Sequence, residues 1–309
     1  MRFRTETALI TGSIAPLITP FTDSGALDIE SLRGLVDWQL AAGSHGISIG
    51  GSTGEPSAQT VTERIEAIRA VAEQIDDRVP FVPGTGSAKL DETLQITAAA
   101  HEAGADAALI ITPYYARPTQ EALYRWYATI AQEFPELPLI MYNVPSRTAV
   151  ELAPDTVARL YRDFDNIVGI KETTKDFEHF SRVIHAAGED ISVWSGIELL
   201  CLPLLALGGV GFVSAVSNIA PRTVARMYEL WTTGEHDAAR RLHYALHPLV
   251  DLLFVETNPA PAKWVLFQQG RITSPYVRPP LITPTAAGIE RIEILLAQAS
   301  AIVNEEKVF

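Results

Sequence analysis

Short apolar runs of strand length recur along the chain, and each is followed by a longer amphipathic stretch. The candidate strands are Ser13–Thr19, Gly46–Ile49, Phe81–Pro83, Ala107–Thr112, Leu139–Tyr142, Ile167–Lys171, Ile191–Trp194 and Gly211–Ala215. The helical patterns between them are Ile29–Ala42, Thr62–Ile75, Leu90–Ala103, Thr119–Phe134, Ala153–Arg162, Phe177–Ala187 and Ile197–Leu207. A helix between successive strands returns the chain to the same end of a sheet, so this alternation predicts parallel strands. The runs are apolar throughout, as expected for strands covered on both faces.

Eight such units predict an α/β fold of the TIM (β/α)8-barrel type, and an open doubly wound sheet is the alternative. The strand signals stop after Pro221. Helical patterns follow at Thr223–Thr233, Glu235–Glu256, Ala260–Gln269 and Thr285–Ile302. We therefore predict a barrel over residues 1–233 and a C-terminal helical region over residues 234–309.

The charge and the cysteine content exclude several classes of partner. A net charge of -13 over 309 residues argues against nucleic-acid binding and against a polybasic membrane contact, since both need clustered Lys and Arg. The uncharged stretch from Leu199 to Pro221 is long enough to span a bilayer, but the glycines in 208–211 divide it. Cys201 is the only cysteine, so no intrachain disulfide can form, and we expect a buried thiol in a cytoplasmic protein.

The sixth candidate strand ends in a lysine, Lys171. The other four lysines lie in polar, loop-like or helix-like surroundings: Lys89, Lys175, Lys263 and Lys307. Burial at a strand end disfavours the ammonium form and frees the amine as a nucleophile, which is the requirement for a Schiff base with a carbonyl substrate. The alternatives are a Lys171 side chain that reaches solvent or one that pairs with Glu172.

In a barrel the active site lies at the carboxyl ends of the strands. The candidate strands end in Gly50–Glu55, Gly84–Gly86, Thr112–Tyr115, Tyr142–Arg147, Lys171, Ser195–Gly196 and Val213–Ser214. Hydroxyls, phenols, an arginine and an amine are therefore predicted at one mouth. No acidic cage accompanies them, which favours a mechanism without a metal.

Several of these residues allow a second interpretation. Ser52 and Thr53 could cap the following helix. Tyr114 and Tyr115 could be packing aromatics, and Arg147 could be a surface residue.

Two further patterns are weak candidates for binding sites. The glycines of 84–86 could form a phosphate loop, but no lysine follows at the required spacing. His243, His247 and Asp251 share one helical face, but they lack a His-Glu-x-x-His motif and lie far from the predicted mouth.

Several long motifs occur in the order found in one known family. They are GSIAPLITPF at Gly12, GGSTGE at Gly50, ITPYYARPTQEALYRWY at Ile111, MYNVPSRT at Met141, GIKET at Gly169 and FVETNPAPAKW at Phe254. With these motifs the chain resembles the dihydrodipicolinate synthase and N-acetylneuraminate lyase family of pyruvate-dependent class I aldolases. The resemblance runs nearly from end to end.

The resemblance implies a set of catalytic roles. Lys171 would condense with the ketone of pyruvate to an imine and then an enamine, so that no separate cofactor is needed. Tyr142 would shuttle protons together with Ser52 and with Tyr115, which would come from a neighbouring subunit. Such a relay suits an enamine, because protons leave and return at several steps. The resemblance also implies a homotetramer built from tight dimers.

Four further residues would bind the substrates. Thr53 would hold the carboxylate of pyruvate, and Gly196 and Val213 would line the pocket. Arg147 would meet the carboxylate of the second substrate, which suits the fixed fork of donors on a guanidinium.

The run 144–148 looks like that of the synthases, which implies aspartate semialdehyde as the second substrate. Ser52, 173–175 and 197–198 differ from the usual synthase pattern. Another Schiff-base aldolase or dehydratase that acts on a different aldehyde or sugar acid is the alternative. A barrel that binds a keto acid for regulation without turnover is a third interpretation.

Strong feedback inhibition by lysine is not expected. Lysine-inhibited synthases carry polar and histidine side chains in a pocket at the dimer interface. The corresponding positions here hold Pro56, Val61, Arg64 and Ala88, and only Tyr114 and Glu92 match.

Overall fold

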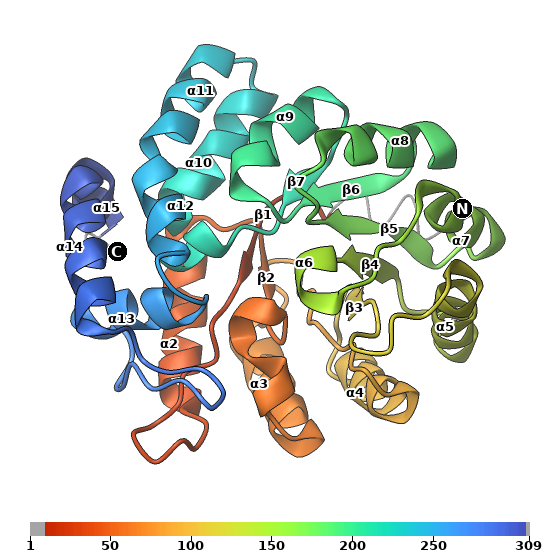
Figure 1. The fold of residues 1–309 in the computed structure, drawn as a ribbon, viewed down its shortest axis with the longest axis horizontal. Coiled ribbons are helices and arrows are strands. Elements are labelled where there is room, and N and C mark those ends of the chain that lie inside the picture. The colour runs from red at the N-terminus through yellow and green to blue at the C-terminus, as the bar shows by residue number, and fades with distance from the viewer. Residues whose placement is uncertain (1–9, 307–309) are drawn as a thin grey trace.

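A single curled sheet of parallel strands lies at the centre of the computed structural model, which describes residues 10–306 (Figure 1). Its strands are β1 (Gly12–Pro16), β2 (Gly46–Ser48), β3 (Ala108–Ile111), β4 (Leu139–Asn143), β5 (Ile167–Glu172), β6 (Ser192–Ser195) and β7 (Gly211–Phe212). They are paired in the order β2-β1-β7-β6-β5-β4-β3. The alternation of strand and helix explains why every pair is parallel.

The segment around Phe81–Pro83 closes this sheet into a barrel. It was predicted as the third strand, but it forms only isolated bridges, to Ile47 in β2 on one side and to Leu109 in β3 on the other. The Val82 amide donates to the Ile47 carbonyl at 2.8 Å, and the Leu109 amide donates to the Pro83 carbonyl at 2.9 Å. A proline has no backbone N–H to donate to a neighbouring strand. This segment therefore makes too few hydrogen bonds to form a full strand. Its contacts on both sides confirm the barrel and exclude the open sheet.

A pair of glycines allows the backbones to meet at this closure. A Cβ on Gly50 would lie 2.6 Å from the Gly84 carbonyl oxygen, and a Cβ on Gly84 would lie 2.6 Å from the Gly50 carbonyl oxygen. Gly50 also has φ +72°, which other residues rarely adopt. Only glycine fits at these two positions.

Helices surround the barrel and follow the predicted pattern. They are α2 (Ile29–Ala42), α3 (Val61–Ile75), α4 (Leu90–Glu102), α5 (Gln120–Glu133), α7 (Pro154–Asp163), α8 (Phe177–Ala187), α9 (Cys201–Ala206) and α10 (Pro221–Thr232). Short turns η2 (Ser52–Gly54), η3 (Pro56–Ala58), α6 (Pro145–Thr148), η4 (Glu198–Leu200) and η5 (Ala215–Asn218) follow the strand ends. The helix predicted over 197–207 is divided between η4 and α9.

The side chains of β4 show how the core is layered. Leu139 and Met141 pack with residues of the outer helices, such as Tyr127 in α5. Ile140 and Tyr142 point the other way, into a cluster made of strand residues that includes Trp194 of β6. This period of two places Tyr142 inside the barrel.

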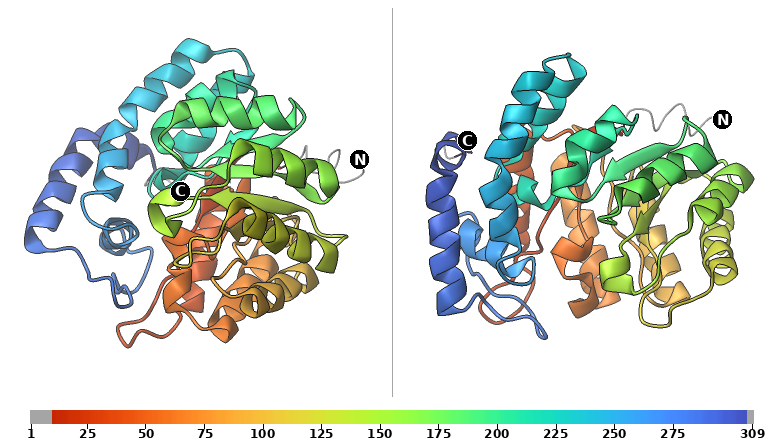
Figure 2. Two further views of the ribbon diagram at one scale, coloured as in Figure 1. Left: turned by 45° about the vertical axis from the view of Figure 1, so that its right-hand side comes forward. Right: turned by 45° about the horizontal axis from the view of Figure 1, so that its top comes forward.

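Helices alone follow α10, namely α11 (His236–Ala245), α12 (His247–Leu253), α13 (Ala260–Gln268), α14 (Ala286–Gln298) and α15 (Ser300–Glu306). They form a layer on one side of the barrel, with α14 and α15 outermost (Figure 2). Their apolar faces join η5 and α10 in one buried cluster. The division of the chain at residue 234 remains a prediction. Within residues 10–306, no helix combines the length and the apolar character needed to cross a bilayer.

Candidate active site

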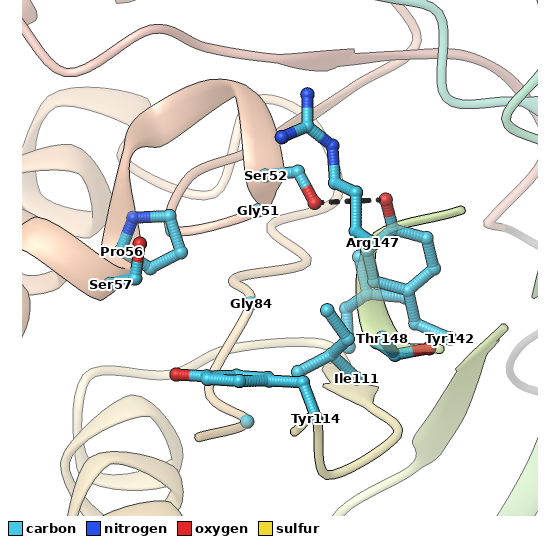
Figure 3. Close-up of a pocket in the computed structure, with 13 residues that line it drawn as sticks. Gly51, Ser52, Pro56, Ser57, Gly84, Ile111, Tyr114, Tyr142, Arg147 and Thr148 are labelled. Carbon is cyan, nitrogen blue, oxygen red and sulfur yellow. Dashed lines mark hydrogen bonds between the residues drawn. The ribbon is translucent and has the colours of Figure 1, made fainter. Parts of the chain in front are cut away.

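A lysine, a tyrosine and a serine meet at the carboxyl end of the sheet. Tyr142 and Lys171 are directly paired in the register of β4 and β5. The Lys171 amine lies 4.1 Å from the centre of the Tyr142 ring. The Tyr142 hydroxyl lies 3.2 Å from the hydroxyl oxygen of Ser52, a hydrogen bond visible in Figure 3. The structure therefore brings together three of the four residues predicted to be catalytic.

A cavity of about 190 Å³ opens beside this group. Its walls are Gly50, Gly51, Ser52, Pro56, Ser57, Gly84, Gly86, Leu109, Ile111, Tyr114, Tyr142, Arg147 and Thr148. Lys171 is buried behind them, with 5% of its surface exposed. Gly196 makes room for the lysine, because a Cβ there would lie 2.7 Å from the Lys171 Cε atom. The cavity is large enough for a small organic substrate.

Ser52 and Thr53 do not cap the following helix. They begin the turn η2, which has no side-chain cap. The N-cap of α3 is Thr60, which forms a reciprocal capping box with Glu63. The alternative interpretation of the two hydroxyls is therefore wrong.

Asn258, which precedes α13, joins two of the predicted substrate-binding residues. Its side-chain amide donates to the Thr53 hydroxyl oxygen at 3.0 Å. Its backbone carbonyl accepts a hydrogen bond from Arg147 at 3.3 Å. Arg147 is exposed, as the surface interpretation requires, but it also lines the rim of the cavity. The motif at Phe254 contains Asn258, but nothing in the sequence assigned it a contact with the mouth.

Besides Lys171, four predicted site residues lie outside the cavity lining: Thr53, Tyr115, Gly196 and Val213. Tyr115 is 94% exposed and has φ +75°, and its neighbour Tyr114 lines the cavity instead. Val213 follows β7 and is buried in the cluster inside the barrel.

Glu172 does not pair with Lys171. Its fully buried carboxylate accepts hydrogen bonds from the Asn143 side chain at 2.9 and 3.0 Å and from the Thr173 and Thr174 amides at 2.9 Å each. Asn143 and Glu172 are also a register pair, one residue beyond the pair of Tyr142 and Lys171. The Glu172 side chain therefore links the ends of β4 and β5 directly behind the site.

Lys263 lies on a helix, as the pattern around it predicts, but its burial was not predicted. This lysine lies on α13 and is fully buried, with its amine 2.5 Å from the Glu55 carboxylate. The amine also donates to the Tyr276 carbonyl at 2.9 Å. Burial lowers the pKa of Lys263 to about 8, although the charge of Glu55 opposes this shift. The helical pattern gave no sign of a buried cation, and Lys307 lies outside the described residues.

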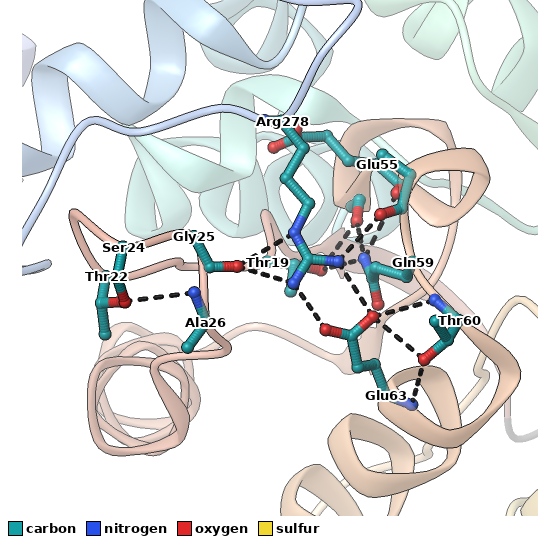
Figure 4. A network of polar contacts seen from close by, with 12 residues as sticks. Thr19, Thr22, Ser24, Gly25, Ala26, Glu55, Gln59, Thr60, Glu63 and Arg278 are labelled. Carbon is teal, nitrogen blue, oxygen red and sulfur yellow. Dashed lines mark hydrogen bonds and ion pairs between the residues drawn. The ribbon is translucent and has the colours of Figure 1, made fainter.

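Arg278, which lies in the C-terminal region, also contacts the turn after β2 that carries Ser52 and Glu55 (Figure 4). Its guanidinium donates to the Gly25 and Ala58 carbonyls and to both carboxylate oxygens of Glu63. Its backbone amide donates to Glu55 at 2.9 Å. The hydrogen bond from Arg278 lowers the pKa of Glu63 to about 2. The turn that carries Ser52 is thus held by two cations from outside the barrel.

A metal centre has no support in residues 10–306, where no group of three or more His, Cys, Asp or Glu side chains is placed to hold an ion. His243 and His247 pack edge to face, with ring centres 5.4 Å apart. Cys201 is buried, as expected, and burial raises the pKa of its thiol.

A buried amine, a phenol and a hydroxyl at the mouth of a (β/α)8 barrel define a barrel enzyme that acts on a small carbonyl compound. The sequence profile of the dihydrodipicolinate synthetase family matches residues 9–299. The chain belongs to this family, and the protein is a lyase.

Relatives and solved structures agree with this assignment. The chain is 46% identical to the 4-hydroxy-tetrahydrodipicolinate synthase of Thermus thermophilus, over 96% of this chain and 98% of the relative. Dihydrodipicolinate synthase of Aquifex aeolicus superposes with a TM-score of 0.91 at 37% identity, over 94% and 99% of the two chains. The chloride-inhibited dihydrodipicolinate synthase of Acinetobacter baumannii, solved with pyruvate, gives a TM-score of 0.90 at 37% identity with the same coverage.

Proposed function

We propose that the enzyme is a 4-hydroxy-tetrahydrodipicolinate synthase, which condenses pyruvate with aspartate semialdehyde through an imine on Lys171. The observation that carries this proposal is the contact of the buried Lys171 amine with Tyr142, whose phenol is hydrogen bonded to Ser52. The synthases among its relatives extend over nearly the whole chain, which supports the same reaction.

The first half of the reaction needs the amine and the relay. The Lys171 amine adds to the ketone carbon of pyruvate, and a molecule of water leaves as the imine forms. Loss of a proton from the methyl carbon gives the enamine. We assign these proton transfers to Tyr142, because its ring lies against the Lys171 amine and its hydroxyl is hydrogen bonded to Ser52.

The second half needs a group that holds the aldehyde. The enamine carbon attacks the aldehyde carbon, a carbon–carbon bond forms, and the alkoxide is protonated through the relay. The amino group of the aspartate semialdehyde portion then adds to the imine carbon, and the Lys171 amine leaves as the ring closes. Thr53 would hold the carboxylate of pyruvate, and Gly196 would leave room for the Lys171 side chain. Arg147 at the rim would bind the carboxylate of aspartate semialdehyde through paired hydrogen bonds.

Turnover of pyruvate with aspartate semialdehyde, followed by a coupled assay, tests this proposal. Arg147→Ala should lower kcat/KM for the aldehyde about 10- to 100-fold, because one charge-assisted contact is lost. The pyruvate adduct trapped by borohydride should be unchanged. Arg162→Ala, which alters an exposed arginine of α7, is the control. A wild-type enzyme that turns over another aldehyde much faster would contradict the synthase assignment.

Activity should be insensitive to lysine. Two candidate binding groups already have partners, because buried Arg64 donates to the Gly84 and Gly86 carbonyls, and Glu92 is paired with Lys89. Initial rates measured over a lysine series should stay constant through the millimolar range. Half-inhibition at a sub-millimolar concentration would show that an effector site exists despite these contacts.

We also propose a homotetramer built from tight dimers in the cytoplasm. The Tyr115 side chain projects into solvent from a backbone in the left-handed region, where non-glycine residues are strained. Such an exposed phenol would be able to enter the cavity of a second subunit and complete the relay. The single buried thiol is compatible with a reducing compartment.

A further inference from the structure

A buried histidine lies behind the linkage between β4 and β5. His179, in the first turn of α8, is 7% exposed. Its Nε2 atom lies 3.2 Å from the Glu172 carboxylate, and its Nδ1 atom lies 3.3 Å from the Glu151 carboxylate. A neutral imidazole has only one N–H, whereas the imidazolium has two. A histidine placed between two carboxylates therefore fits this site as the cation.

The charges around His179 all favour its protonated form. Glu172 faces it from β5, Glu151 from the segment before α7, and Asp176 from the N-cap of α8. Burial opposes protonation, but the nearby carboxylate of Glu172, with the charges of Glu151 and Asp176, raises the pKa of His179 above its usual value.

The Glu172 carboxylate connects His179 to the strand ends that carry Tyr142 and Lys171. It fixes Asn143, the residue after Tyr142, and the amides of Thr173 and Thr174. The Glu172 carbonyl also accepts a hydrogen bond from the Gly196 amide at 2.8 Å, which ties in the end of β6 beside Lys171.

We propose that the imidazolium of His179 is a positioning group, which holds the Glu172 carboxylate and thereby the alignment of Lys171 with Tyr142. This inference rests on the proposed Schiff-base role of Lys171. Loss of the proton leaves the buried Glu172 charge without its cation. The pKa of His179 is raised in the folded enzyme. The stabilisation that its charge contributes is therefore complete below the pKa of the unfolded state, about 6.5, and is lost as the pH rises through the pKa of the folded state.

Glu151→Gln tests the inference without altering the catalytic residues. Glu151 is about half exposed, so the variant should fold normally while removing one carboxylate from His179. Histidine labelled with ¹³C at Cε1 should titrate at His179 above about pH 6.5 in the wild type, and the midpoint should fall by roughly half a unit in the variant. The rate of formation of the borohydride-trapped pyruvate adduct should show an alkaline decrease that moves by the same amount. Glu178→Gln, which removes an exposed carboxylate paired with Arg182, is the control.

His179→Gln supplies a second measurement. Its adduct formation should be slowed roughly 10-fold at neutral pH, with little change in KM for pyruvate and without the component of the alkaline decrease assigned to His179. His185→Gln, at an exposed position on the same helix, should behave as the wild type. Adduct formation by His179→Gln at the wild-type rate with the wild-type pH profile would overturn the inference.

Two further results would also overturn it. One is a titration midpoint of His179 at or below the usual value, and the other is a shift of that midpoint in Glu151→Gln without a shift in the rate profile. Each of these leaves the proposed function intact, because the adduct still forms at Lys171. Absence of any adduct at Lys171 in the wild type would instead remove the proposed function, and with it the role of His179.

Discussion

Lys171→Ala should abolish the pyruvate adduct and lower kcat by at least about 10⁴-fold, because the nucleophile is lost and no other group forms the same imine. Borohydride reduction in the presence of pyruvate, followed by mass spectrometry of the digested protein, measures the adduct. The coupled assay measures kcat. Thermal unfolding close to that of the wild type would show that the loss is chemical.

Two other lysines make the test specific. Lys175→Ala changes an exposed lysine four residues further on and should keep both the adduct and the activity. Lys263 is the second buried amine of the described chain, but its ion pair with Glu55 occupies it. An adduct that persists in Lys171→Ala and maps to Lys263 would contradict the assignment of the nucleophile.

Lys263→Met should lower the free energy of unfolding by about 3–5 kcal/mol, because it leaves the Glu55 carboxylate buried without its cation. Unfolding in urea, monitored by circular dichroism, measures this loss. Lys89→Met, which breaks the exposed pair with Glu92, should leave the urea midpoint unchanged.

The double variant Lys263→Met/Glu55→Gln separates the charge from the packing. Removing both charges should recover a large part of the stability that Lys263→Met loses, since the remaining amide needs no counter-ion. If the double variant loses more free energy of unfolding than the two single variants lose together, packing at α13, rather than the unpaired charge, causes the effect.

Local patterns were sufficient to predict the barrel and the burial of Lys171 near the end of a strand. The alternation of apolar runs with amphipathic stretches located β4, β5 and α8 to within one residue at each end. It failed for Phe81–Pro83, because prolines limit the hydrogen bonds of a segment whose apolar character is that of a strand.

Contacts between distant segments could not be predicted from such patterns. Thr53 and Asn258 are 205 residues apart in the chain, and only the folded structure shows their hydrogen bond. Lys263 lies in a helical pattern that resembles that of an exposed lysine, and its burial depends on Glu55 arriving from the turn after β2. The contact of His179 with Glu172 likewise depends on the folded structure, in which Glu172 lies at the paired ends of β4 and β5.

The closure of the barrel at residues 81–84 divides the site into a stiff half and a softer half. Lys171 and Tyr142 lie on strands whose pairing is regular from Ile140 to Asn143, whereas Ser52 follows Gly50, which lies against the segment that forms only isolated bridges. Local fluctuations concentrate where backbone hydrogen bonds are few. Thermal motion should therefore change the distance from Ser52 to Tyr142 more than the distance from Lys171 to Tyr142. The proposed nucleophile and Tyr142 are preorganised by the sheet, whereas Ser52 is the part of the proposed relay that a bound substrate has to bring into order.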